Sequence, residues 1–329
     1  MLFDNHGRQL NYVRIAVTDR CNLRCSYCMP EEGIRYMPKK DLLTFEEIQR
    51  LVALLAEMGI SKVRFTGGEP FVRKDFMRLV HSVSRIKGIT GLHITTNGVL
   101  TAPYVKELKQ AGVKSVNLSL DTLDKERFKT ITRRDEFDNV MGTLGLLLDE
   151  GIEVKINAVV MEGKNTDDIL PLVAFTRSNP VSVRFIEEMP FNGGGKYSPT
   201  LTWTYHKIID HIKKAYPGLA KLKDGAHSTS YNYAVPGHKG NVGVIAAFSR
   251  TFCGTCDRIR ITAQGTLKTC LYDNGVLNVR DLVRAGAPDG DLKKILLKAF
   301  KNRAKDGHEA GQDRRANAVA SESMSTIGG

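Results

Sequence analysis

The residues with the clearest chemical potential in this 329-residue chain are its six cysteines, which fall into two groups of three. The first group has the spacing C-x3-C-x2-C. In the second, a C-x2-C pair is followed by a third cysteine after thirteen intervening residues. The groups are Cys21, Cys25 and Cys28, and Cys253, Cys256 and Cys270. Thiolates gathered in this way bind zinc or iron–sulfur clusters.

The number of cysteines in each group favours iron–sulfur clusters over zinc. Structural zinc normally takes four protein ligands, whereas each group stops at three and no histidine lies at the spacing that a fourth ligand would need. A four-iron cluster held by three thiolates leaves one iron with an open position for a substrate or cofactor. Two zinc sites of unusual composition remain the alternative.

The chain has the features of a cytoplasmic protein. Residues 1–6 lack a basic segment followed by an apolar stretch, and no run approaches the roughly 20 apolar residues of a membrane-spanning helix. In the cytosol thiols stay reduced and serve as metal ligands more often than as disulfides. We therefore expect no membrane association.

The balance of charge indicates an anionic partner. Lysine and arginine number 48 against 36 acidic residues, a formal net charge of +12, which suits a nucleic acid or a phosphorylated small molecule. Aromatic residues make up 7% and do not interleave with a basic face, so we predict no nucleic acid. No G-x4-G-K-[ST] loop is present, so side chains would have to bind any phosphate groups.

The cysteines and basic residues must be positioned by an α/β fold. Short β-rich segments alternate with helical patterns, of which the clearest is residues 45–55, with Thr44 as N-cap and Glu47 completing a capping box. This alternation predicts right-handed βαβ units and a parallel sheet, either open or an incomplete barrel, with its chemistry at the carboxyl ends of the strands. The predicted strands are residues 13–17, 62–65, 91–95, 115–119, 154–159 and 181–186.

The alternation stops after Pro190. Residues 191–195 are rich in glycine and predict a flexible loop, and the polar residues 301–329 predict a mobile tail.

Two motifs resemble those of radical S-adenosylmethionine (SAM) enzymes. Residues 21–28 (CNLRCSYC) are similar to the signature loop of that family, and residues 66–70 (TGGEP) look like its motif for the amino group of the cofactor. The resemblance implies an incomplete (β/α)6 TIM-like barrel and a [4Fe-4S] cluster on the first group of cysteines. It also implies reductive cleavage of SAM to a 5′-deoxyadenosyl radical.

The second group of cysteines narrows this resemblance. Residues 252–262 (FCGTCDRIRIT), the Cys270-Leu271 pair and the C-terminal MSTIGG resemble the GTP 3′,8-cyclases of molybdenum cofactor synthesis. The resemblance implies conversion of GTP to (8S)-3′,8-cyclo-7,8-dihydroguanosine 5′-triphosphate, the first step of that synthesis. It also implies a C-terminal extension with a second [4Fe-4S] cluster, whose open iron binds guanine.

The resemblance assigns further residues by position. The SAM-binding positions are Tyr27, Gly68, Ser119 and Met189. The GTP-binding positions are Arg14, Arg64, Thr95, Lys155, Arg258 and Arg260. Arg64, Arg258 and Arg260 also alternate along predicted strands, which would point them to one face. The C-terminal Gly328 and Gly329 are implied to reach into the site and assist turnover.

The resemblance further implies an organisation and partners. We expect a partial barrel over residues 1–190, a domain with the second cluster and the substrate site over residues 191–310, and a tail over residues 311–329. A flavodoxin- or ferredoxin-like reductant and the downstream cyclic pyranopterin monophosphate synthase are the expected partners of a monomer or homodimer. The roles of residues 193–195 and 300–320 stay open.

Three other functions stay open at this point. The first is another radical SAM enzyme with an auxiliary cluster, acting on a peptide or a cofactor precursor. The second is an iron–sulfur electron carrier, although carriers usually close their clusters with four protein ligands. The third is a basic RNA-binding protein with structural metal.

Overall fold

The computed structural model describes residues 1–193, 201–312 and 322–328. In these residues eight parallel strands form the centre of one sheet: β1 (Tyr12–Ala16), β2 (Lys62–Thr66), β3 (Gly91–Thr96), β4 (Val113–Ser119), β5 (Glu153–Val160), β6 (Ser182–Glu187), β9 (Asn241–Ile245) and β10 (Arg258–Ile261). Four short strands extend its margins in antiparallel pairing: β7 (Ala220–Lys221), β8 (Ser230–Ala234), β11 (Thr266–Lys268) and β12 (Leu277–Asn278). The strand order is β12-β11-β10-β1-β2-β3-β4-β5-β6-β9-β8-β7.

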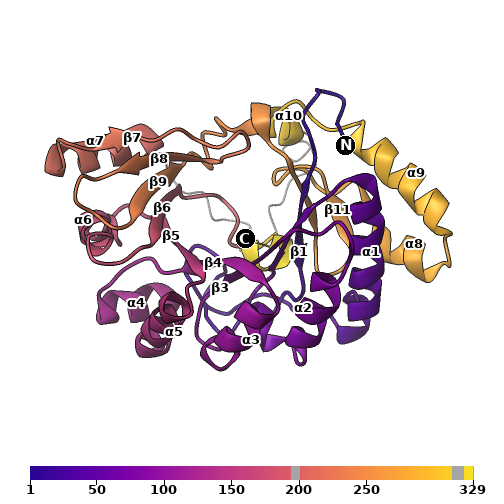
Figure 1. Ribbon diagram of the computed structural model, residues 1–329, viewed down its shortest axis with the longest axis horizontal. Helices are drawn as coiled ribbons and strands as arrows, with labels where there is room; N and C mark the ends of the chain where they lie inside the picture. Colours follow the sequence, from indigo (N-terminus) through magenta and orange to yellow (C-terminus); the bar gives the residue numbers. More distant parts are fainter. Residues whose placement is uncertain (194–200, 313–321, 329) are drawn as a thin grey trace.

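Helices cover the outer side of this curved sheet (Figure 1). Those that follow the first six strands are α1 (Phe45–Met58), α2 (Phe76–Ser84), α3 (Val105–Gln110), α4 (Lys125–Thr132), α5 (Phe137–Asp149), α6 (Ile169–Phe175) and α7 (Tyr205–Ala215). Alternate strand residues such as Val13, Val63 and Ile156 are fully buried in the apolar core. Because successive strand residues point to opposite faces, the intervening polar residues share the inner face.

The structure confirms the predicted incomplete barrel. Six strands lie within two residues of their predicted bounds, and α1 carries the predicted capping box, with Glu47 N donating to Thr44 Oγ1 (3.1 Å). The margins β12 and β7 each pair on one side only among the described strands, so the sheet does not close. No helix within the described ranges is both long and apolar enough to cross a membrane.

One of the parallel strands, β9, was not predicted, and β10 was expected only as the strand that carries Arg258 and Arg260. Both lie beyond residue 190, where the regular strand–helix pattern ends, and join the sheet beside β6 and β1 respectively. The rest of the C-terminal part adds α8 (Val279–Arg284) and α9 (Asp289–Phe300). The sheet therefore continues across the predicted boundary at residue 190.

The prediction of a mobile tail over residues 301–329 is wrong for the part that the structure describes. Short helices α10 (Gly307–Ala310) and α12 (Met324–Ile327) form there, and the side chains of Asp306 and Ser323 cap them. Arg303 and Ile327 are 5% and 1% exposed. Hydrogen bonds and helix caps order this segment. The prediction failed because it considered only the low content of apolar residues. Residues 313–321 and Gly329 lie outside the described residues.

The predicted flexible loop over residues 191–195 is also wrong at its first two positions. Phe191 is 1% exposed and packs against Tyr272, with ring centroids 5.4 Å apart, while Asn192 forms a β-bridge with Ser323. Residues 194–200 lie outside the described residues.

The turn after β2 packs directly on the loop after β1, which carries the first three cysteines. Gly68 N donates to Thr18 O and Glu69 N donates to Arg20 O, both at 2.8 Å. A Cβ on Gly68 would lie 2.2 Å from Arg20 O, and one on Gly67, whose φ is +143°, would lie 2.3 Å from Thr18 O. Glycine is required here because two backbones meet without room for a side chain.

A matched pair of substitutions tests this requirement. We expect Gly68→Ala to lower the free energy of unfolding by about 1–3 kcal/mol, because a backbone must move to admit the methyl group. Gly142→Ala, inside α5 with nothing within 4 Å of the new Cβ, should raise it by about 0.5–1 kcal/mol. Urea unfolding of the cluster-free protein measures both. If both substitutions change the free energy of unfolding equally, the backbone contact between Gly68 and Arg20 has room for a methyl group.

Candidate active site

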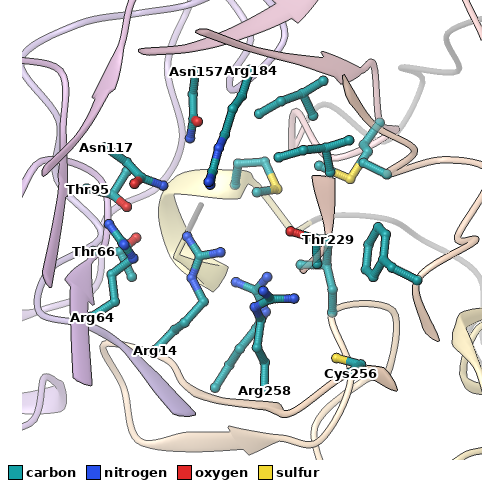
Figure 2. Close-up of a pocket in the computed structure, with 18 of the residues that line it drawn as sticks. Arg14, Arg64, Thr66, Thr95, Asn117, Asn157, Arg184, Thr229, Cys256 and Arg258 are labelled. Atoms are coloured by element: carbon teal, nitrogen blue, oxygen red, sulfur yellow. The ribbon is translucent and has the colours of Figure 1, made fainter. Parts of the chain in front are cut away.

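The inner face of the barrel lines one cavity of about 890 Å³. Figure 2 shows guanidinium groups of several strands, Arg14, Arg64, Arg184 and Arg258, directed into it, with Cys256 at its edge. Almost all of the site residues predicted from the sequence line this cavity: Arg14, Cys21, Cys25, Tyr27, Cys28, Arg64, Gly68, Thr95, Ser119, Lys155, Met189, Cys253, Cys256, Arg258, Arg260 and Cys270. The two groups of cysteines therefore border the same space.

The first group of cysteines lies in the loop between β1 and α1. Leu23 N and Asn97 Nδ2 donate to Cys21 Sγ at 3.4 and 3.6 Å. Burial, with the nearby charge of Glu69, raises the pKa of Cys21 to about 12. Burial likewise raises the pKa of Cys28 to about 11. These thiols need a nearby cation to ionise, and bound iron supplies one.

Glu69 organises the strand end that faces this loop. Its carboxylate is fully buried and accepts hydrogen bonds from Thr96 Oγ1 (2.8 Å), Asn97 N (2.7 Å) and Phe71 N (3.2 Å). Burial outweighs these bonds and raises its pKa to about 7. Glu69 therefore holds Asn97, in the segment after β3, where its side-chain amide reaches Cys21.

The second group of cysteines lines the same cavity from the segments before β10 and after β11. Each sulfur has a nearby N–H: Gly307 N is 3.4 Å from Cys253 Sγ, and Tyr272 N is 3.5 Å from Cys270 Sγ. Arg303 Nη2 lies 3.9 Å from Cys256 Sγ. Such N–H donors to sulfur are typical of iron–sulfur sites.

The chemistry of both donor sets fits iron–sulfur clusters. Each set offers three reduced thiols with N–H donors beside at least one sulfur. Among the described residues, no three His, Cys, Asp or Glu side chains form a group that could hold a single metal ion. In a four-iron cluster, by contrast, each thiolate binds a different iron.

A ladder of cations crosses the inner face of the sheet. Arg14 is in register with Arg64 on one side and with Arg260 on the other. Burial and the charge of Arg260 lower the pKa of Arg14 well below its usual range, and burial with Arg64 lowers that of Arg184 to about 10. Burial and the charge of Arg184 also lower the pKa of Lys155, which pairs with Glu153 (Nζ to Oε1, 2.7 Å). An anion bound among these groups would relieve their repulsion.

Several buried polar atoms on the cavity wall have no hydrogen-bond partner among the described residues. They are Thr95 Oγ1, Asn117 Oδ1, Asn157 Oδ1, Arg184 Nε and Arg258 Nη1. Buried polar groups are rarely left unsatisfied, so this wall is suited to a polar ligand. Thr95 pairs in register with Asn117, and Asn157 with Arg184.

The sequence analysis did not single out Asn117, Asn157 or Arg184. All three lie on predicted strands at the same alternation as the buried cations. The alternation could have identified them, because their apolar neighbours along the strand, such as Val183 and Phe185, point to the opposite, buried face.

The C-terminal segment lies beside the first group of cysteines. Ser323 Oγ donates to Cys28 O (2.6 Å) and Arg260 Nη1 donates to Gly328 O (2.5 Å). Figure 1 shows α12 at the centre of the molecule, on the inner side of the sheet. Gly328 thus contacts one of the predicted GTP-binding arginines, while Gly329 lies outside the described residues.

Comparison with known proteins agrees with this geometry. Residues 15–176 match the model of the radical SAM superfamily, and residues 181–309 match that of "Molybdenum Cofactor Synthesis C". Two crystal structures share the fold. One is SuiB from Streptococcus suis bound to S-adenosylmethionine, with a TM-score of 0.61 and 18% identity over 88% of this chain and 68% of that chain. The other is anSMEcpe with bound AdoMet, with a TM-score of 0.56 and 18% identity over 91% of this chain and 82% of that chain.

Relatives of higher identity carry names from molybdenum cofactor synthesis. The chain is 44% identical to molybdenum cofactor biosynthesis protein 1 of Mus musculus over 90% of its own length, but spans only 46% of that protein. It is 41% identical to the GTP 3′,8-cyclase of Peptoclostridium acidaminophilum, over 93% of both chains. This chain belongs to the radical SAM superfamily and, within it, to the GTP 3′,8-cyclase family of molybdenum cofactor biosynthesis.

Proposed function

We propose that this protein is a GTP 3′,8-cyclase that catalyses the first step of molybdenum cofactor biosynthesis. The observation that carries the proposal is the buried cation ladder in a cavity bordered by both groups of cysteines. Superfamily membership implies a [4Fe-4S] cluster and SAM. When bound, these supply the radical that removes a hydrogen atom from the ribose of GTP.

The first cysteine loop and the adjacent strand ends hold the cluster and SAM in this proposal. Cys21, Cys25 and Cys28 bind the cluster. The SAM-binding positions are Tyr27, Gly68, Ser119 and Met189, all of which line the cavity. Tyr27 OH donates to Asp121 Oδ2 (3.0 Å), which fixes the orientation of the ring.

The second cysteine group and the cations hold GTP. Cys253, Cys256 and Cys270 would hold a second [4Fe-4S] cluster, which would offer a binding position for the guanine base. The triphosphate lies among Arg14, Arg64, Thr95, Lys155, Arg258 and Arg260. Guanidinium groups suit this role because their planar fork binds phosphate oxygens in pairs and keeps its charge. Arg184, from the same inner face, adds a further positive charge.

The predicted organisation and partners complete the proposal. Residues 1–190 supply the first six strands of the partial barrel. Residues 191–310 add β9 and β10 and carry the second cluster and much of the substrate site, and residues 311–329 end in the two glycines. A flavodoxin- or ferredoxin-like protein supplies electrons in the cytoplasm, and cyclic pyranopterin monophosphate synthase consumes the product.

An anaerobic assay tests the activity. We expect the protein, reconstituted with iron and sulfide and supplied with dithionite, SAM and GTP, to form 5′-deoxyadenosine and a cyclised guanosine triphosphate. Liquid chromatography with mass spectrometry measures both products, and ATP in place of GTP is the control. If SAM is cleaved equally with and without GTP, the result would favour a radical SAM enzyme whose substrate is a peptide or a cofactor precursor. The absence of cleavage with about eight irons bound would favour an electron carrier.

The C-terminal glycines give a second test. We expect deletion of Gly328 and Gly329 to abolish the nucleotide product while both clusters persist, because Arg260 loses the carbonyl that it contacts. Product formation and iron content are measured on the same preparation. Full activity of the truncated chain would exclude a role in turnover.

Tyr12 predicts a pH dependence of GTP binding. Its hydroxyl accepts a hydrogen bond from Arg64 Nε (2.5 Å), and its ring lies 5.5 Å from the Arg258 guanidinium. Burial favours the neutral phenol, but Arg64, Arg14 and Arg258 outweigh it and lower the pKa of Tyr12 to about 8. Above that pH the phenolate cancels one positive charge and repels a triphosphate.

We therefore expect GTP affinity to fall as pH rises from 7 to 9, and Tyr12→Phe to flatten that fall. Calorimetric titration of the reconstituted protein without SAM measures the affinity. Tyr104→Phe, whose ring stacks on Phe71, is the control. An unchanged pH profile in the Tyr12→Phe variant would contradict this assignment.

A further inference from the structure

Arg303 is buried beside the second group of cysteines, although it lies in a segment for which the sequence analysis assigned no role. Its guanidinium donates to Thr269 O (Nε, 3.1 Å), to Cys256 O (Nη1, 3.2 Å) and to Arg258 O (Nη2, 3.1 Å). It also pairs with Asp4 Oδ2 (Nη1, 3.2 Å), and Nη2 lies 3.9 Å from Cys256 Sγ. One side chain thus fixes the backbone at Cys256 and immediately before Cys270.

Arg8 makes the matching connection at the remaining cysteine. Its Nη1 donates to Cys253 O (3.1 Å) and to Lys305 O (2.7 Å), and its Nη2 donates to Ala304 O (2.9 Å). Its Nε pairs with Asp4 Oδ2 (2.6 Å), the oxygen that also accepts from Arg303. Two arginines, both paired with Asp4, therefore donate to backbone carbonyls at, or next to, all three cysteines.

The charges of this group do not cancel. Asp4 is 3% exposed; burial alone would raise its pKa, but hydrogen bonds and the charge of Arg8 lower it, so it stays ionised. Two guanidinium groups share this carboxylate, so these three side chains together carry one positive charge. The carboxylates of Asp273, which accepts from Cys270 N (2.8 Å), and of Asp306 are negative charges near the same cysteines. Of these side chains, Arg303 contacts a cysteine sulfur directly, with its Nη2 3.9 Å from Cys256 Sγ.

We propose that Arg303 is a positioning residue for the cluster on Cys253, Cys256 and Cys270, and that its charge raises the reduction potential of that cluster. The inference rests on the second cluster of the proposed function. Groups outside the ligand set orient the ligands, and hydrogen bonds to sulfur and local charge set the potential. A positive charge near Cys256 Sγ favours the reduced cluster, which carries one more electron.

The test uses the full chain with Cys21, Cys25 and Cys28 replaced by alanine, so that iron reports on the second group alone. Into this parent we introduce Arg303→Met, Arg303→Lys or the control Arg284→Met. Arg284 makes a comparable set of bonds, to Glu47 and the carbonyls of Lys40 and Leu42, without contacting a cysteine. The measurements are iron per chain, the rate of iron release to a chelator, and the midpoint potential followed by electron paramagnetic resonance.

We expect Arg303→Met to release iron on the order of 10-fold faster than the parent and to have a more negative midpoint potential. Arg303→Lys should restore most of the potential, because it keeps the charge, but not the slow release, because one ammonium cannot replace the five-donor fork. Arg284→Met should match the parent in both measurements.

Parent-like release and potential in Arg303→Met would overturn the proposal. Equal iron loss from the first group, measured in the reciprocal background with Cys253, Cys256 and Cys270 replaced by alanine, would also overturn it, because general loosening of the fold would then be the cause. If the parent with Arg303 intact binds no iron, the second cluster itself fails, and this result is seen before any arginine is changed.

Discussion

The mutual repulsion of cations on the inner face of the sheet is the constraint on which the rest of the structure depends. Arg260, Arg14 and Arg64 occupy one register position on three neighbouring strands, so hydrogen bonding of the sheet fixes how closely they approach. Burial and repulsion together lower the pKa of Arg14. The apolar core between the sheet and its outer helices must hold these charges in place until an anion compensates them.

Arginine also has a second use in this chain, as a bridge between irregular backbone segments. Arg73 donates to Val17 O and Leu43 O, and Arg8 and Arg303 do the same around the second cysteine group. Loops that hold cofactors lack the regular partners of helices and sheets, so their carbonyls need other donors. Part of the net charge of +12 therefore serves the architecture and not an anionic ligand.

The parts of the site that could be predicted from sequence are those encoded locally. Cysteine spacing and the Gly67-Gly68 pair lie within a few residues of one another, and the alternation along β10 indicated that Arg258 and Arg260 share a face. Arg184 and Asn157 required a further step, because their side of the sheet had to be recognised as polar. Arg303 could not be found in this way, since its partner Asp4 lies 299 residues away and no periodic pattern connects them.

The path of the chain around the two cysteine groups has a consequence for biosynthesis. Ser323 covers Cys28, and Arg303 joins Asp4 to the backbone at Cys256. Arg303 and Ser323 follow all six cysteines in the sequence, so a ribosome makes them later than any of the thiols. The contacts that cover the two groups of thiols therefore form only after all six cysteines have been made, so during synthesis there is an interval in which the thiols lack this cover and iron can reach them.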